Sequence, residues 1–229
     1  MPGTLFVVAT PIGNLEDLTF RALRTLKEVD LIAGEDTRRT SRLLAHYNIR
    51  KSMVSLREHN EHRETPRLVA RLQGGQSIAL VSDAGTPTIS DPGHLLVRAP
   101  RDAGITVSPI PGPSAVMAAL SATGVPADQF VFLGFPPHGG KARDDWFSTL
   151  TAETRTAVFF EAPHRIRQTI EKVCSCLGNK PIHVHRELTK INESFVIYTN
   201  KEAPDSVRAL GEFVVVVGPS SINTETSGD

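Results

Sequence analysis

Short apolar runs alternate with amphipathic stretches along the first half of the chain. Such runs predict strands at residues 5–9, 30–33, 53–56, 77–81 and 105–107. Between them we expect a helix at residues 19–29, where Phe20, Leu23, Leu26 and Val29 share one face. Further helices are expected at the polar stretch 37–47, at residues 61–72 and, beginning at a proline, at residues 92–99. Strands that alternate with helices are typical of α/β architecture with a largely parallel sheet.

A proline-rich break at residues 109–113 precedes a further helix at residues 115–122, for which Ser114 is the expected N-cap. Beyond it, apolar runs predict strands at residues 130–133, 156–160, 182–185, 194–199 and 213–217. Helical spacing returns at residues 143–150 and 164–176. The chain turns back within residues 187–199, which predicts adjacent strands there and hence a mixed sheet. We therefore expect two α/β domains, residues 1–122 and 123–229, followed by a frayed polar tail from residue 220.

Four unusual loops follow predicted strands of the first domain, at residues 10–15, 34–38, 82–87 and 109–114. Ligands of open α/β sheets bind outside the carboxyl ends of the strands, so these loops are candidates for a ligand site. The first has one glycine where a dinucleotide fold needs three, and its Pro11 lacks a phosphate-binding N–H. Asp83 instead suits a ligand with ribose hydroxyls or an ammonium group.

Charge and composition narrow the function class. Lysine plus arginine equals aspartate plus glutamate, at 25 each, which argues against a wholly basic nucleic-acid binder but allows a local basic patch. Glu35 and Asp36 stand beside three arginines, which form either a surface ion-pair cluster or a phosphate-binding patch. No apolar run approaches the length of a membrane span, and the amino terminus lacks signal-peptide features, so we expect a cytoplasmic protein.

Neither of two possible metal motifs matches a usual zinc signature. Cys174 and Cys176 precede His183 and His185, but the spacing is wrong for a structural zinc site, and the stretch at residues 58–62 is more typical of a polar loop. There is also no nucleophile elbow or catalytic triad order. We therefore expect no metal.

Several motifs, in order, resemble one known family. These are GEDTRRT, SDAGTPTISDPG, PGPSA, FFEAPHR and RELTK, within a resemblance that runs from about residue 3 to residue 218. Together they resemble the bacterial 16S ribosomal RNA (cytidine-2′-O)-methyltransferases, in the tetrapyrrole-methylase-like class of S-adenosylmethionine (SAM) methyltransferases. GEDTRRT and SDAGTPTISDPG are highly specific in this order, whereas PGPSA indicates only the wider class.

The resemblance implies that SAM binds in a cleft between the two domains, that the substrate partner is 16S ribosomal RNA in the small subunit, and that the protein is a homodimer. Carried onto this sequence, the SAM site consists of Ile12, Gly13, Asp83, Thr86, Ser114, Ala115, Ala162 and His185. The last two rest on the resemblance alone. Related enzymes commonly continue beyond the second domain.

The implied reaction moves a methyl group to a ribose 2′-oxygen, a weakly acidic group that benefits from a nearby base. Glu35 or Asp36 is the expected base and Lys190 polarises the oxygen; alternatively, Lys190 is a surface lysine and the acidic pair an arginine-bound scaffold. The expected phosphate contacts are Arg38, Arg39, Arg165 and Arg167. Two alternatives remain: methylation of a small tetrapyrrole, and a non-catalytic RNA-binding or assembly module, which the short carboxyl end favours slightly.

Overall fold

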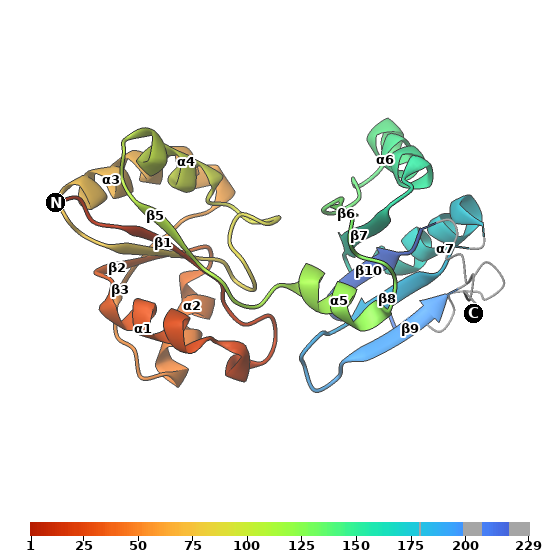
Figure 1. The fold of residues 1–229 in the computed structure, drawn as a ribbon, viewed down its shortest axis with the longest axis horizontal. Helices are drawn as coiled ribbons and strands as arrows, with labels where there is room; N and C mark the ends of the chain where they lie inside the picture. Colours follow the sequence, from red (N-terminus) through yellow and green to blue (C-terminus); the bar gives the residue numbers. More distant parts are fainter. Residues whose placement is uncertain (179, 199–207, 220–229) are drawn as a thin grey trace, which may run out of the picture. The chain divides into compact units, whose positions relative to one another are not determined.

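The computed structural model describes residues 1–178, 180–198 and 208–219, and the chain divides into two compact units, Met1–Ser114 and Ala115–Asp229 (Figure 1). This division falls before the helix α5 (Ala115–Thr123), whereas the sequence placed the boundary after residue 122. The apolar face of α5 packs against strands of the second unit, which explains the difference. The expected tail and residue 199, the expected end of a strand, lie outside the described residues.

The first unit contains a five-stranded parallel sheet in the order β3-β2-β4-β1-β5. Its strands are β1 (Leu5–Val8), β2 (Leu31–Gly34), β3 (Ser52–Ser55), β4 (Ile78–Val81) and β5 (Val107–Ile110). The central strands β2 and β4 are buried at every position, as both faces of a parallel sheet are covered.

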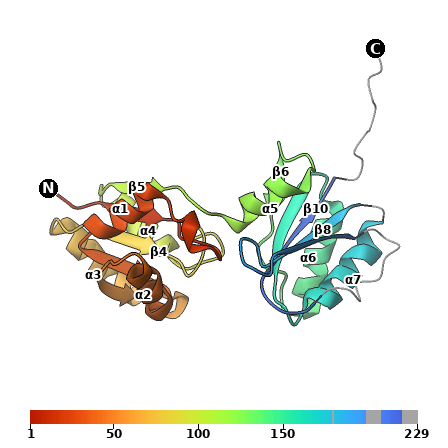
Figure 2. The same cartoon turned by 90° about the horizontal axis from the view of Figure 1, so that it is seen from below.

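Helices cover both faces of this sheet (Figure 2). They are α1 (Phe20–Glu28), α2 (Thr37–His46), α3 (Glu61–Gln73) and α4 (His94–Asp102), with short 3₁₀ turns η1 (Leu15–Asp17) and η2 (Glu58–Asn60). The apolar residues of α1 and α2 form a core on one face, and those of α3 and α4 form a core on the other. In α1 the apolar residues Ala22 and Leu26 are buried, whereas Phe20, the first residue of the predicted apolar face, is 94% exposed.

Strand β5 differs from the prediction, which ended it at residue 107. The observed strand continues through Pro109, which pairs in register with Val7 of β1. Proline cannot donate to a sheet ladder, but β5 is an edge strand with a neighbour on one side only, and an edge strand tolerates the missing N–H.

The second unit has a mixed sheet in the order β6-β7-β10-β8-β9. Its strands are β6 (Phe130–Phe132), β7 (Thr156–Glu161), β8 (Ile182–Arg186), β9 (Ser194–Tyr198) and β10 (Phe213–Val217). The helices α6 (Gly140–Ala152) and α7 (Ile166–Leu177) cover one face, and α5 packs on the other. The predicted α/β class is confirmed, with a parallel first sheet and a mixed second sheet.

None of the helices in the described part of the chain has both the length and the apolar content that a membrane crossing requires.

Candidate functional site

Four loops of the first unit meet at one edge of its sheet. They follow β2, β4, β1 and β5, which are neighbours in the sheet and all run in the same direction. Because the carboxyl ends of parallel strands lie at the same edge, the loops selected from the sequence are neighbours in the fold.

Hydrogen bonds tie these loops together. The backbone N–H of Thr10 donates to the carbonyl oxygen of Gly85, and the N–H of Gly85 donates to that of Thr10, each at 2.9 Å. The Thr10 hydroxyl also donates to the carbonyl of Ser82 at 3.2 Å, and the Thr86 hydroxyl donates to the carbonyl of Pro113 at 3.2 Å. Three loops therefore form one braced backbone layer, which favours a preorganised binding site.

Asp83 links this layer to the loop after β2. One carboxylate oxygen accepts the backbone N–H of Asp36 at 2.9 Å, and the other lies 3.5 Å from Nε of Arg39. The side chain remains 22% exposed, so it has surface left for a ligand. A carboxylate has about four acceptor positions, so these two contacts leave others open.

The structure separates the roles of Glu35 and Asp36. Burial, followed by the negative charge of Asp83, raises the pKa of Glu35 above its ordinary value. Asp36 instead caps α2 by accepting the N–H of Arg38 at 2.9 Å, and this hydrogen bond is the main cause that lowers the pKa of Asp36. Of the two carboxylates, Glu35 therefore has the higher affinity for a proton.

Arginines stand around the acidic pair. The side chains of Arg38 and Arg39 are 86% and 61% exposed, and both lie in the first turn of α2. Arg57, which the sequence analysis did not select, donates from Nε to the carbonyl oxygen of Glu35 at 3.1 Å. The arginines are thus both partners of the loop and exposed donors for an anion.

Ile12 and Gly13 lie in the loop after β1, where Ile12 is buried and Gly13 is exposed. Gly85 has a φ of +80°, and a Cβ built on it would lie 3.4 Å from Cγ2 of Ile12. The two loops therefore pack closely through a residue that tolerates a left-handed backbone. Ser114 ends the first unit and Ala115 begins α5, and both are half-buried.

The remaining site residues lie in the second unit, where the ends of β7 and β8 meet at one edge of its sheet. Phe213 of β10 pairs with Glu161 of β7 on one side and Arg186 of β8 on the other. Ala162 follows the first of these strands, and the loop with Lys190 follows the second. Their register therefore brings Ala162 and the Lys190 loop to one edge.

Arg165 has an internal partner, although the sequence analysis placed it against phosphate. Its guanidinium is 10% exposed and lies 2.7 Å from the carboxylate of Glu161, which is itself fully buried. Arg143 is 3.8 Å from the same carboxylate and donates to the Thr169 hydroxyl at 2.7 Å. This placement gives Arg165 a structural role and leaves little of it for RNA, whereas Arg167 is exposed.

Lys190 lies between two carboxylates, 2.8 Å from Glu187 and 3.0 Å from Glu212. Burial disfavours its charge, but hydrogen bonds to Glu187 and Glu212 outweigh that effect, and the pKa of Lys190 is raised. The ammonium group stays charged and can polarise an oxygen rather than accept a proton. Glu187 has a φ of 55°, an uncommon backbone conformation that recurs at functional loops.

His185 is buried on β8, with its ring 4.7 Å from the ring of Phe195. Burial, and then the neighbouring His183, lower the pKa of His185, which stays neutral. Its Nε2 atom is buried and has no hydrogen-bond partner among the described residues. This nitrogen, like both ring nitrogens of His183 on the same strand, is therefore available to a water or a ligand.

The sequence analysis missed Asp91, the second aspartate of the SDAGTPTISDPG motif. Burial raises its pKa, a hydrogen bond from Ser82 lowers it and the carboxylates of Glu35 and Asp83 raise it, with a net pKa of about 6. The position of Asp91 in a loop with two aspartates was the available signal, but only the fold brings it near Glu35.

The residues present fit SAM in chemical type. Asp83 supplies acceptors for hydroxyl or ammonium groups, the glycine-containing loops supply backbone groups, and His185 supplies an unpaired nitrogen. No group of three or more histidine, cysteine or carboxylate side chains suited to a metal occurs in the described ranges.

Known proteins match this chain over most of its length. The profile of the tetrapyrrole (corrin/porphyrin) methylases matches residues 4–204. A Xylella fastidiosa protein named ribosomal RNA small subunit methyltransferase I is 50% identical over 94% of this chain and 81% of its own length. A Halalkalibacterium halodurans protein of the same name is 48% identical over 94% of this chain and 75% of its own.

Solved structures share the fold at low identity. A uroporphyrin-III-C-methyltransferase from Thermus thermophilus has a TM-score of 0.64 at 22% identity, with 94% of each chain covered. A diphthine synthase has a TM-score of 0.71 at 14% identity, covering 94% of this chain and 90% of its own. With its profile match and close relatives, this chain belongs to the tetrapyrrole (corrin/porphyrin) methylase family.

Proposed function

We propose that this chain transfers a methyl group from SAM to the 2′-oxygen of a cytidine ribose in 16S ribosomal RNA of the small ribosomal subunit. The observation that carries the proposal is the identity of 48–50%, over 94% of the chain, to relatives named ribosomal RNA small subunit methyltransferase I. The exposed arginines of α2 support it, because an RNA substrate needs phosphate contacts beside the reacting ribose.

Both units contribute to the SAM site in this proposal. The contacts come from Ile12, Gly13, Asp83, Thr86, Ser114, Ala115, Ala162 and His185. When bound, SAM supplies a methyl group already activated on a sulfonium. The residues of this chain then align the ribose hydroxyl and exclude water, a contribution that reaches about 7–11 kcal/mol in favourable cases.

Glu35 accepts the proton of the ribose 2′-hydroxyl in our proposal, and Lys190 stabilises the negative charge that develops on the oxygen. The raised pKa of Glu35 makes it the better base of the acidic pair, because Asp36 is held ionised by its capping hydrogen bond. A positioned base contributes about 10²–10⁴-fold to the rate.

Arg38, Arg39 and Arg167 bind the RNA backbone in this proposal, since all three are exposed. Arg165 supports the loop after β7 from inside. Binding to phosphates releases counterions, so the affinity for RNA falls as salt rises. We also propose that the protein is a homodimer, and sedimentation at the mass of one chain would contradict this part.

The test is methyl transfer from labelled SAM to small ribosomal subunits that lack the modification, followed by digestion of the RNA to nucleosides. The label should appear in 2′-O-methylcytidine. Glu35→Gln should lower kcat about 10²–10⁴-fold, whereas Asp36→Asn should have a smaller effect. Label on a porphyrin-type substrate instead would favour tetrapyrrole methylation, and SAM binding without transfer to either substrate would favour a non-catalytic module.

A further inference from the structure

Positive charge is concentrated in one segment of a chain that is neutral in total. Residues 37–73 contain nine lysines and arginines and three glutamates, a net charge of +6, so the rest of the chain carries −6. This segment spans α2, β3 and α3. A strongly positive region on a neutral protein is the electrostatic footprint of a polyanion partner.

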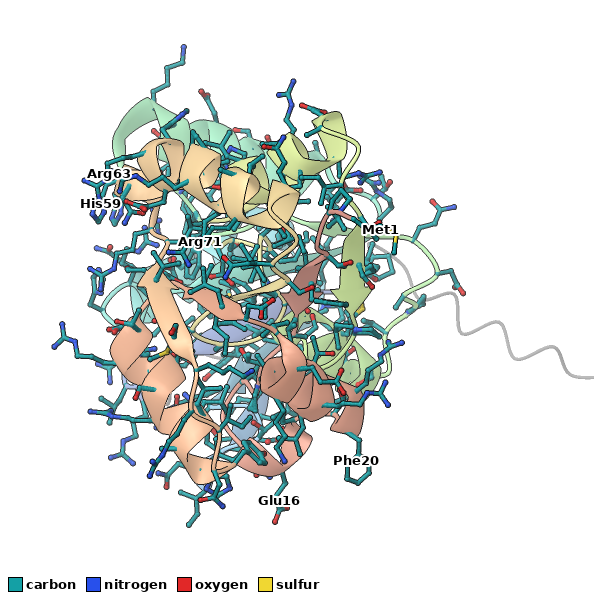
Figure 3. All side chains as sticks on the ribbon, turned by 90° about the vertical axis from the view of Figure 1, so that its left-hand side faces the viewer. Met1, Glu16, Phe20, His59, Arg63 and Arg71 are labelled. Atoms are coloured by element: carbon teal, nitrogen blue, oxygen red, sulfur yellow. The ribbon has the colours of Figure 1, made fainter. Side chains whose placement is uncertain are left out.

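The cations of this segment differ in how they are paired. Arg63 and Arg67 lie 2.8 and 3.3 Å from Glu64, and Figure 3 shows Arg63 and His59 reaching outward at one edge of the first unit. The side chains of Arg42, Arg50 and Lys51 form no ion pair or hydrogen bond with any described residue. Arg42 and Arg50 are exposed and Lys51 is half-buried, so their charges are available to a partner.

Arg50 and Lys51 border a hollow of about 630 Å³ between the end of α2 and strand β3. Ser41 and Asn48 add polar groups to it, and Leu44 and Ile49 form a buried apolar floor. The backbone that carries Arg50 is fixed, because the N–H of Ile49 donates to the carbonyl of Leu44 at 2.8 Å. A cationic rim over an apolar floor suits a nucleotide, whose phosphate and base have these two characters.

Helix α2 connects this hollow to the candidate catalytic site. Its first turn carries Arg38 and Arg39 beside Glu35, and Arg42 lies one turn further along, four residues from Arg38 on the same face. The helix has ten residues, so its two ends are about 15 Å apart at 1.5 Å per residue. A row of exposed cations therefore runs from the catalytic loops to the hollow.

We propose that the hollow with Arg42, Arg50 and Lys51, called here the α2–β3 surface, binds the backbone of the substrate RNA about one length of α2, roughly 15 Å, from the catalytic loops. The inference rests on the proposed function and adds to it a second contact region. It accounts for unpaired cations that neither the SAM site nor the proton transfer uses.

The test compares Arg50→Ala/Lys51→Ala with the wild-type protein in binding to a 16S ribosomal RNA transcript at several salt concentrations. Two lost phosphate contacts should weaken binding about ten-fold near 0.15 M salt and reduce the slope of log affinity against log salt by about 1.4. The affinity of this double variant for SAM should equal that of the wild-type protein. That result would also show that the first unit of the variant is folded.

Arg98→Ala/Arg101→Ala is the matched control, because it removes two cations from α4, which packs on the opposite face of the sheet. If wild-type protein methylates the RNA and the two double variants bind it equally well, the α2–β3 surface is refuted while the proposed function stands. If wild-type protein neither binds nor methylates RNA, both fail.

Discussion

Asp91 provides the sharpest quantitative prediction. Its carboxyl is half-buried in the loop after β4, beside the negative charges of Glu35 and Asp83. The Ser82 hydroxyl has one proton, yet it lies 3.3 Å from the carbonyl oxygens of both Ala84 and Gly85 as well as being bonded to Asp91. The Ser82 hydroxyl therefore opposes the rise only in part, and burial, together with the charges of Glu35 and Asp83, brings the pKa of Asp91 to about 6.

The expected change in the free energy of unfolding with pH follows from the linkage between proton binding and folding. The pKa of Asp91 is about 6 in the folded protein and 3.8 in the unfolded reference, so the folded state binds the proton more tightly. This stabilisation is complete below pH 3.8 and is lost as pH rises through 6. At 1.36 kcal/mol per pKa unit the loss is at most about 3 kcal/mol, and about 1–3 kcal/mol for a half-buried group.

Asp91→Asn keeps a similar shape but cannot ionise. Its free energy of unfolding, relative to wild type, should therefore rise by about 1–3 kcal/mol between pH 4 and pH 8. Urea unfolding followed through the amide NMR signals of β4 reports on the first unit, and Asp102→Asn, an exposed change on α4, is the control. A difference that stays constant with pH, or a directly titrated carboxyl with an ordinary pKa, would refute the reasoning.

Three further substitutions test other parts of the structure. Gly93 has a φ of +121°, and a Cβ built on it would lie 2.8 Å from Cδ2 of Leu80. Gly93→Ala should therefore destabilise the first unit by about 1–3 kcal/mol in urea unfolding. An unchanged unfolding midpoint would contradict this backbone strain. Glu161→Ala leaves two arginines buried without their partner and should lower the free energy of unfolding of the second unit by about 3–5 kcal/mol. Unfolding is measured through the fluorescence of Trp146, and a loss below about 1 kcal/mol would contradict a buried network. Lys190→Met should lower kcat while SAM affinity, measured calorimetrically, stays unchanged; equal kcat would assign the lysine a structural role.

The strands and the ligand loops were predictable because both depend on local signals. Apolar runs mark the buried parallel strands, and polar loops with glycine and proline mark their carboxyl ends. Pro109 misled the prediction, since the sequence does not reveal that β5 is an edge strand. The place of α5 was also hidden, because an apolar helix between two domains can pack on either.

The side-chain partners in the candidate site required the fold. Arg165 lies four residues after Glu161, but the sequence does not show that this carboxylate is fully buried and binds the arginine from inside. Asp91 was visible in its motif, yet its raised pKa arises first from burial and then from the charge of Glu35, which belongs to a different strand end. Charged side chains that are far apart in the sequence contact each other in this site, and only the folded structure shows which of them are paired.

A calorimetric titration with SAM tests most directly the claim that the braced loops of the first unit hold the cofactor. We expect saturable binding of one SAM per chain, and Asp83→Ala should weaken it about 10–100-fold, the size of a lost hydrogen bond to a charged group. Asp102→Ala should bind SAM as the wild-type protein does. Equal SAM affinity of the Asp83→Ala and wild-type proteins would show that the loop after β4 is structural and would contradict the site described here.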